Sequence, residues 1–130
     1  MKKTLFLFAA VLILASFTSC EDDVSYPVNR VEIRDALGRK VAAYKTDGFD
    51  VNANIELNAV FLNAKNEAKP VSNPENILWT MSNNENSWFG PENRGYTVYF
   101  NPPPGAAGPT VLWMKVEYGG FSYRVDFQLK

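Results

Sequence analysis

One stretch near the C-terminus decides the fold class: TVLWMKVEYGGFSYRVDFQL, residues 110–129. Apolar and polar residues alternate along both halves, which is the pattern of a β-strand with one buried face. The dipeptide Gly119-Gly120 separates the halves and accepts positive φ without steric cost, so it predicts a two-residue hairpin turn. The inward face of the last strand then carries Phe121, Tyr123, Val125, Phe127 and Leu129.

The same alternation recurs upstream and predicts an all-β domain. Expected strands cover residues 28–34, 41–44, 54–62, 77–81, 96–100, 110–118 and 121–129. Helical periodicity is weak, and Gly38 interrupts the best helix candidate. Loops are expected at residues 63–74, 83–94 and 101–105, the last because consecutive prolines cannot donate hydrogen bonds within a sheet. Strands separated by turns every 8 to 15 residues or so predict an antiparallel two-sheet β-sandwich of about seven strands.

The first twenty residues are typical of an export signal. Lys2 and Lys3 precede an unbroken apolar run over residues 5–15. As a helix, this run would span ~16 Å, about half of a hydrocarbon core of ~30 Å. It is therefore too short for a comfortable transmembrane helix and fits the apolar region of a signal peptide.

The segment after this run contains two small residues, Thr18 and Ser19, directly before Cys20, the only cysteine of the chain. It resembles a bacterial lipobox, with Phe17 where an aliphatic residue is usual. The resemblance implies cleavage before Cys20 and a thioether link from its sulfur to diacylglycerol. The alternatives are an ordinary cleaved signal with an incidental cysteine, and an uncleaved anchor. We expect residues 1–19 to be the signal peptide.

An acidic cluster, Glu21, Asp22 and Asp23, follows the cysteine directly. A cysteine followed by such a cluster resembles the export signal of surface lipoproteins in Bacteroidetes-type bacteria. That resemblance implies a lipid anchor in the outer membrane with the domain facing the cell exterior. A solvated tether explains the same charges, because like charges repel and extend a chain, and a periplasm-facing anchor stays open. We expect residues 20–27 to be a lipidated tether and residues 28–130 the folded domain.

Two short segments carry a second resemblance. They are ILWTMS, residues 77–82, with Trp79 in its centre, and AAGPTVL, residues 106–112. Both are similar to segments of bacterial immunoglobulin-like (Ig-like or PKD-like) domains: the strand whose tryptophan fills the space between the sheets, and the turn before the penultimate strand. The resemblance implies an Ig-like sandwich without the paired cysteines of antibody domains. The fold alone names no function.

The composition excludes most catalytic chemistry. With no histidine and one cysteine in 130 residues, the chain has no Ser-His-Asp or Cys-His site, no intramolecular disulfide and no multi-cysteine metal site. Fourteen acidic and thirteen basic residues give a net charge of -1, which argues against nucleic-acid binding. A Gly-rich phosphate loop and a nucleophile elbow are both missing. We predict a non-enzymatic protein with no catalytic residue, cofactor or metal.

Carboxylates leave two alternatives open. Glycoside hydrolysis needs only a carboxylate pair, but no pairing signal distinguishes the acidic residues from an ordinary solvated surface. The candidates are Asp47, Asp50, Glu56, Glu85 and Glu92. The segment of residues 47–50, with Asn52 and Asn54 nearby, offers oxygen ligands of the kind that calcium accepts. Its spacing differs from an EF-hand, and a turn that uses Asp and Gly for their backbone freedom is the simpler interpretation.

Three aromatic residues are candidates for ligand contact: Trp88, Phe89 and Trp113. The first two lie between polar segments, and Trp113 shares its strand face with Lys115 and Glu117. Exposed tryptophan stacks on sugar rings and is enriched at protein contacts. The alternative is that Trp88 closes one end of the sandwich and that a loop covers Trp113.

We therefore predict a surface-exposed, non-enzymatic binding or accessory lipoprotein, with glycan capture as its use. Trp88 and Trp113 on one face would favour this function. The alternative is a structural or adhesion subunit that docks to another cell-envelope protein. An unpaired apolar edge strand would favour that alternative.

Overall fold

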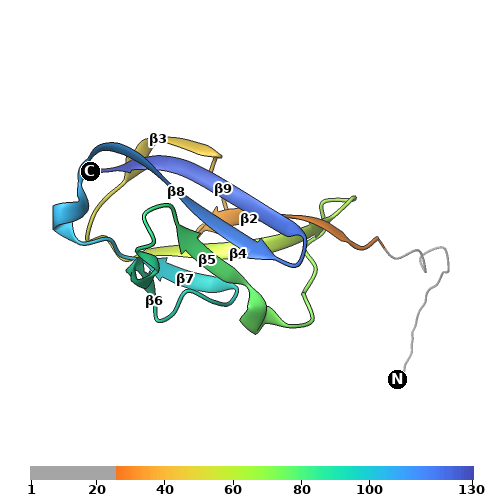
Figure 1. Cartoon of the computed structure of the whole chain (residues 1–130). Helices are drawn as coiled ribbons and strands as arrows, with labels where there is room; N and C mark the ends of the chain where they lie inside the picture. Colours follow the sequence, from red (N-terminus) through yellow and green to blue (C-terminus); the bar gives the residue numbers. More distant parts are fainter. Residues whose placement is uncertain (1–25) are drawn as a thin grey trace, which may run out of the picture.

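The computed structural model describes residues 26–130, which form two four-stranded β-sheets packed face to face (Figure 1). One sheet has the order β2-β4-β7-β6 and the other has the order β3-β9-β8-β5. The strands are β2 (Val28–Asp35), β3 (Tyr44–Phe49), β4 (Ile55–Asn63), β5 (Leu78–Met81), β6 (Phe89–Gly90), β7 (Thr97–Phe100), β8 (Gly108–Tyr118) and β9 (Phe121–Leu129). Short 3-10 helices lie in the connections: η2 (Pro74–Asn76), η3 (Asn86–Trp88) and η4 (Pro104–Ala106). The predicted all-β, two-sheet sandwich is confirmed.

Most expected strands lie within two residues of their observed bounds. β9 begins and ends where the alternation predicts, and β8 begins two residues earlier, at Gly108. The strand expected over residues 41–44 is wrong, because Val41 belongs to the crossover between the sheets and the strand begins at Tyr44. The two-residue strand β6 lies inside an expected loop.

β3 corrects the expectation of a purely antiparallel sandwich. It runs parallel to β9, with Tyr44 opposite Asp126 and Phe49 opposite Leu129. The other strand pairs of residues 26–130 are antiparallel. The chain leaves the first sheet after Asp35 and crosses to the second sheet over residues 36–43.

Gly48 lies within β3, so the expected turn at residues 47–50 is wrong. Its φ of 67° is in the left-handed region, and the register with β9 shifts between Lys45 and Phe49. A Cβ at this position would lie 2.5 Å from the main-chain oxygen of Gln128. The glycine therefore allows β3 to approach β9 closely at an irregularity in the strand.

The hairpin between β8 and β9 is confirmed. Tyr118 lies opposite Phe121, and Gly119 takes a φ of 59° in the turn between them. Glycine adopts this conformation without the steric penalty of a Cβ. The pairing fixes which residues of both strands face the core.

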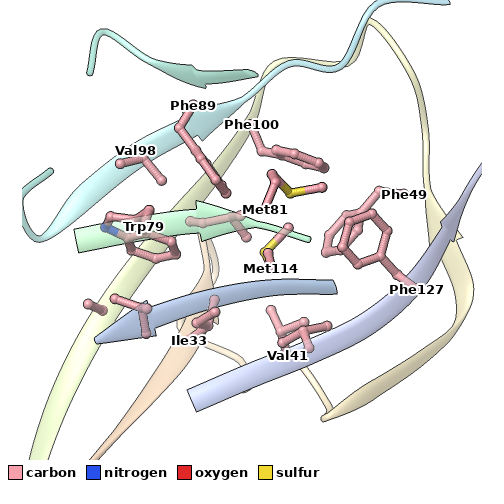
Figure 2. Close-up of a cluster of buried hydrophobic side chains, with 14 of the residues drawn as sticks. Ile33, Val41, Phe49, Trp79, Met81, Phe89, Val98, Phe100, Met114 and Phe127 are labelled. Atoms are coloured by element: carbon pink, nitrogen blue, oxygen red, sulfur yellow. The ribbon is translucent and has the colours of Figure 1, made fainter. Parts of the chain in front are cut away.

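Trp79 is fully buried between the two sheets, as predicted, and lies at one side of the cluster drawn in Figure 2. Its side chain is 0% exposed, and its indole Nε1 donates a hydrogen bond to the Gly95 carbonyl oxygen over 2.9 Å. Its ring lies 5.8 Å from the ring of Phe89. A second aromatic group lies across the core from it, made of Phe49, Phe100 and Phe127 with T-shaped contacts between the rings (Figure 2).

The two ends of the sandwich carry different segments (Figure 1). β2 begins beside the hairpin turn of β8 and β9, where Val28 lies opposite Asn63 and the Tyr118 ring is 5.5 Å from Phe61. We call this the tether end, because β2, the first strand of the described chain, begins there. The C-terminus, η3 and η4 lie at the opposite end, which we call the distal end (Figure 1).

Candidate functional site

Phe89, one of the aromatic residues predicted to contact a ligand, is a core residue. Its side chain is 2% exposed and packs between Trp79 and Phe100, with ring centroids 5.8 Å and 5.3 Å away. The Phe89 ring is therefore not accessible to a ligand from solvent. The burial of Phe89 could not be predicted from the sequence, because the strand that positions it is two residues long and shows no alternation.

Trp88 is half-buried and lines a cavity of about 450 Å³ at the distal end of the sandwich. Its ring packs against the core ring of Phe100, with the centroids 6.4 Å apart. Pro109 and Leu112 line the apolar part of this cavity, which we call the distal cavity. The expectation that Trp88 closes one end of the sandwich is consistent with this packing, but the ring also borders an open space.

Hydrogen bonds fix the backbone around Trp88. Its N–H donates to the Glu85 carbonyl over 3.1 Å, and its own carbonyl accepts from the Asn101 N–H over 2.8 Å. The Asn86 side-chain oxygen accepts from the N–H of Met81 over 2.8 Å, which ties η3 to the end of β5. The wall of the cavity is therefore tied to the end of β5 and to the residue that follows β7.

Polar groups complete the distal cavity. Asn83 and Glu85 line it, and the Asn83 side-chain oxygen accepts a hydrogen bond from the Glu85 N–H over 3.1 Å. An aromatic ring, apolar neighbours, an amide and a carboxylate together suit a sugar, whose ring has an apolar face and whose hydroxyls need hydrogen-bond partners. Glu85 is the one carboxylate among the described residues that line the cavity, whereas glycoside hydrolysis needs a pair.

Trp113 lies on the outward face of the second sheet, as the alternation predicts. The Arg124 guanidinium and the Lys115 ammonium lie 5.1 Å and 5.7 Å from the centre of its ring. These cations also pair with Asp126 over 2.8 Å and with Glu117 over 3.4 Å. Side chains of its own sheet therefore cover the ring, and not a loop as the alternative interpretation required.

Trp88 and Trp113 do not form one platform. Leu112 lines the distal cavity, and successive side chains of a strand point to opposite faces, so Trp113 points away from that cavity. In the described part of the chain, the two rings therefore do not lie on one face, the arrangement that would have favoured a shared glycan surface. Each ring is a separate candidate.

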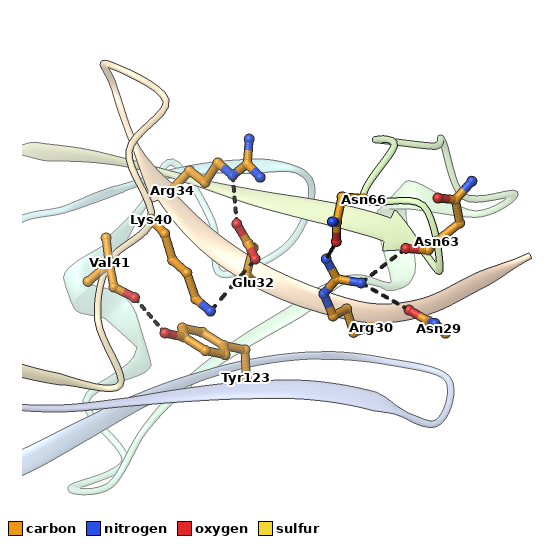
Figure 3. A network of polar contacts seen from close by, with 9 residues as sticks. All are labelled: Asn29, Arg30, Glu32, Arg34, Lys40, Val41, Asn63, Asn66 and Tyr123. Carbon is orange, nitrogen blue, oxygen red and sulfur yellow. Dashed lines mark hydrogen bonds and ion pairs between the residues drawn. The ribbon is translucent and has the colours of Figure 1, made fainter.

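A buried carboxylate that the sequence did not single out, Glu32, organises the crossover (Figure 3). Its side chain is 8% exposed and accepts a 2.8 Å hydrogen bond from Arg34, and Lys40 lies 3.9 Å away. The Tyr123 hydroxyl donates to the Val41 carbonyl over 2.6 Å. Burial and the negative charge of Glu32 raise the pKa of Tyr123 above its ordinary value. These contacts hold the crossover against both sheets.

The acidic residues around Gly48 do not converge on a metal site. Asp47 pairs with Lys45 over 2.7 Å, and this hydrogen bond with its charge lowers the pKa of the Asp47 carboxyl. Asp50 lies 4.0 Å from Lys130. Within residues 26–130, no group of three or more acidic or cysteine side chains could hold a metal ion.

The predicted lipidation and export residues lie outside the described residues. They are Cys20, Glu21, Asp22 and Asp23, together with the signal peptide over residues 1–19. In the described part, no helix is long and apolar enough to span a membrane.

Comparison with known protein families finds no match for this chain, and neither the curated proteins nor the solved structures provide one.

Proposed function

We propose that the mature protein is a lipid-anchored surface lipoprotein whose Ig-like sandwich binds a carbohydrate without transforming it. The observation that carries the proposal is the distal cavity, where Trp88 borders an open space together with Asn83 and Glu85. The binding residues are Trp88 for stacking, and the Asn83 amide and Glu85 carboxylate for hydrogen bonds to hydroxyl groups.

The strand order supports the Ig-like part of the proposal. The orders β2-β4-β7-β6 and β9-β8-β5 correspond to the ABED and GFC sheets of immunoglobulin domains, with β3 added beside the last strand. Trp79 on β5 takes the place of the buried tryptophan on strand C. Such domains place their connecting loops at the two ends of the sandwich, and one of these ends holds the distal cavity.

The position of the cavity suits a membrane anchor at Cys20. The tether of residues 20–27 spans at most about 27 Å when extended. It connects to β2, which begins at the tether end, so an anchor at Cys20 would leave the opposite end farther from the membrane. A cavity at the distal end is therefore presented to ligands outside the cell.

The anchor is tested by the variant Cys20→Ala in the full chain. We expect this variant to leave the membrane fraction, because acyl chains supply the membrane affinity. Protease treatment of intact cells should degrade the wild-type domain if it faces the exterior. Membrane association that is unchanged in the variant would contradict the anchor, and full protection from protease would place the domain on the inner side.

Carbohydrate binding is tested with soluble residues 24–130, which retain both sheets and the whole core. We expect this protein to bind members of a broad glycan panel and Trp88→Ala to abolish the binding. Trp113→Ala is the matched control, since it removes a second half-buried indole and should leave binding unchanged. Loss of binding in Trp113→Ala alone would move the site to the outward sheet face. A panel without any binding would overturn the carbohydrate proposal.

A further inference from the structure

β3 has one free edge. It pairs with β9 on one side, and its other side faces an open groove of about 640 Å³ between the crossover and the start of β4. The Ala43 and Phe49 carbonyls accept hydrogen bonds from β9 and its C-terminal neighbour. Because main-chain groups alternate in direction along a strand, Tyr44 and Thr46 direct their N–H and C=O groups into the groove.

The opposite edge of the same sheet is closed. On β5, the N–H of Trp79 donates to the Asn93 carbonyl over 2.9 Å, and the N–H of Met81 donates to the Asn86 side chain. The Asn93 amide donates in turn to the Trp79 carbonyl over 2.9 Å. Among the described residues, β3 is therefore the edge of this sheet on which a further strand would find free main-chain groups.

We infer that β3 pairs antiparallel with β3 of a second copy of this chain, about a two-fold axis at Thr46. The edge sequence KTD, residues 45–47, is self-complementary in this register. Lys45 lies opposite the partner's Asp47, and Asp47 lies opposite the partner's Lys45. The symmetry repeats every contact once, as an interface between identical surfaces requires.

The hydrogen-bond pattern agrees with this register. Thr46 directs its main-chain groups toward the groove, so the two Thr46 residues form a hydrogen-bonded pair across the axis. Lys45 and Asp47 then occupy non-hydrogen-bonded pairs, where opposing Cα atoms are only about 4.5 Å apart and side chains meet most closely. Within one copy these side chains already pair over 2.7 Å, so the dimer joins two ion pairs into a four-membered network.

Tyr44 extends the exposed part of this edge. Its side chain is 53% exposed and lies two residues from the axis at Thr46. The regular register ends after Asp47, because Gly48 has a left-handed φ of 67° and its Cβ position points toward Gln128 of β9. The contact therefore centres on Lys45, Thr46 and Asp47.

The pairing has a consequence for anchored copies, and this consequence rests on the proposed lipid anchor. β3 runs parallel to β9, away from the tether end, so an antiparallel pair places the two tethers at opposite ends of the dimer. β8 alone is about 37 Å long at its 11 residues, which exceeds the reach of about 27 Å of an eight-residue tether. A dimer whose long axis stands perpendicular to the membrane would therefore join copies on two facing membranes.

The pairing itself is tested by sedimentation of soluble residues 24–130, which contain neither the anchor nor a glycan. We expect the average mass of the wild-type protein to rise with concentration and to fall again at high salt, because the central contacts are ionic. Lys45→Asp alone and Asp47→Lys alone place like charges opposite each other, so each should weaken dimerisation about tenfold or more.

Charge swapping separates this interface from a merely structural ion pair. An equimolar mixture of Lys45→Asp and Asp47→Lys restores both opposite-charge contacts between copies, while the pair within each copy stays broken. The mixture and the double variant should both regain the dimer, and a misfolded variant would not. A wild-type protein that stays monomeric at all concentrations, or single variants that dimerise as before, would overturn the inference without affecting the proposed carbohydrate site.

Discussion

Replacing Gly48 with alanine tests the closest backbone approach in the sandwich. Gly48 and Gly119 have nearly the same backbone conformation, with φ of 67° and 59°. An added Cβ at Gly48 would lie 2.5 Å from the Gln128 main-chain oxygen, whereas one at Gly119 would meet nothing within 4 Å. Gly119→Ala is therefore a control that shares the backbone strain and the change in unfolded-chain entropy but not the contact.

The expected losses follow from these contacts. A left-handed alanine costs about 1–2 kcal/mol, which we expect for both variants. In Gly48→Ala, the strands must also separate, which weakens the hydrogen bonds from Lys130 to Phe49 and from Val51 to Lys130. At about 1 kcal/mol for each bond, the variant should lose about 3–4 kcal/mol in total.

Urea unfolding of soluble residues 24–130, followed by tryptophan fluorescence, measures both variants. Their midpoints should fall at an unchanged slope, since the exposed area on unfolding is the same. Equal losses in Gly48→Ala and Gly119→Ala would refute the reasoning, because they would show that β3 does not approach β9 as closely as the structure has it.

Three further perturbations test the core and the polar network. Trp79→Ala removes a fully buried indole and should lower the free energy of unfolding by about 3–5 kcal/mol in urea titrations, while a near-neutral result would contradict its burial. Glu32→Gln should lower the free energy of unfolding by only about 1–2 kcal/mol, because the side chains of Arg34 and Lys40 are 33% and 56% exposed and can be hydrated when the carboxylate is removed. A loss above about 3 kcal/mol would show that these two cations are buried together with Glu32. The raised pKa of Tyr123 means that the folded state holds the phenol proton more tightly than the unfolded state, so stability is present below pH 10.0 and is lost as pH rises through the folded pKa. Tyr123→Phe should reduce this alkaline loss in thermal melts, and an identical pH profile in the variant would contradict the assignment.

The sequence predicted the parts of the fold where local chemistry and tertiary packing agree. The alternation of residues 121–129 and the Gly119-Gly120 turn specify a hairpin without reference to the rest of the chain. Trp79 lies in a short apolar run between polar segments, so its burial follows from the same pattern. In each case one face of the strand is apolar and meets the opposite sheet.

β3 could not be predicted in the same way. Asp47 and Gly48 have turn chemistry, and an isolated window shows nothing that distinguishes a turn from an irregular strand. Gly48 is needed because of Gln128, eighty positions away in the sequence, and the parallel pairing depends on a crossover that only tertiary contacts fix. The sequence therefore showed that Gly48 needs an unusual backbone conformation, but not that the approach of β9 requires it.

The candidate site was predictable in part. Alternation correctly placed Trp113 on the outward face of β8, and the polar surroundings of Trp88 correctly marked it as different from the strand tryptophans. Phe89 was misjudged, because β6 is too short for a periodic pattern. Glu32 was missed, since its burial comes from the crossover that folds over β2, and a charged residue on a strand ordinarily indicates solvent.

The most direct test of the proposed function uses the three tryptophans as probes in one experiment. Each indole N–H gives its own signal in a proton–nitrogen-15 correlation NMR spectrum of residues 24–130. The three signals report on the core (Trp79), the distal cavity (Trp88) and the outward sheet face (Trp113). On titration with a glycan that the panel identifies, we predict that the Trp88 signal shifts in proportion to occupancy while the other two stay in place. A shift confined to Trp113, or no shift at any of the three, would contradict a carbohydrate site in the distal cavity.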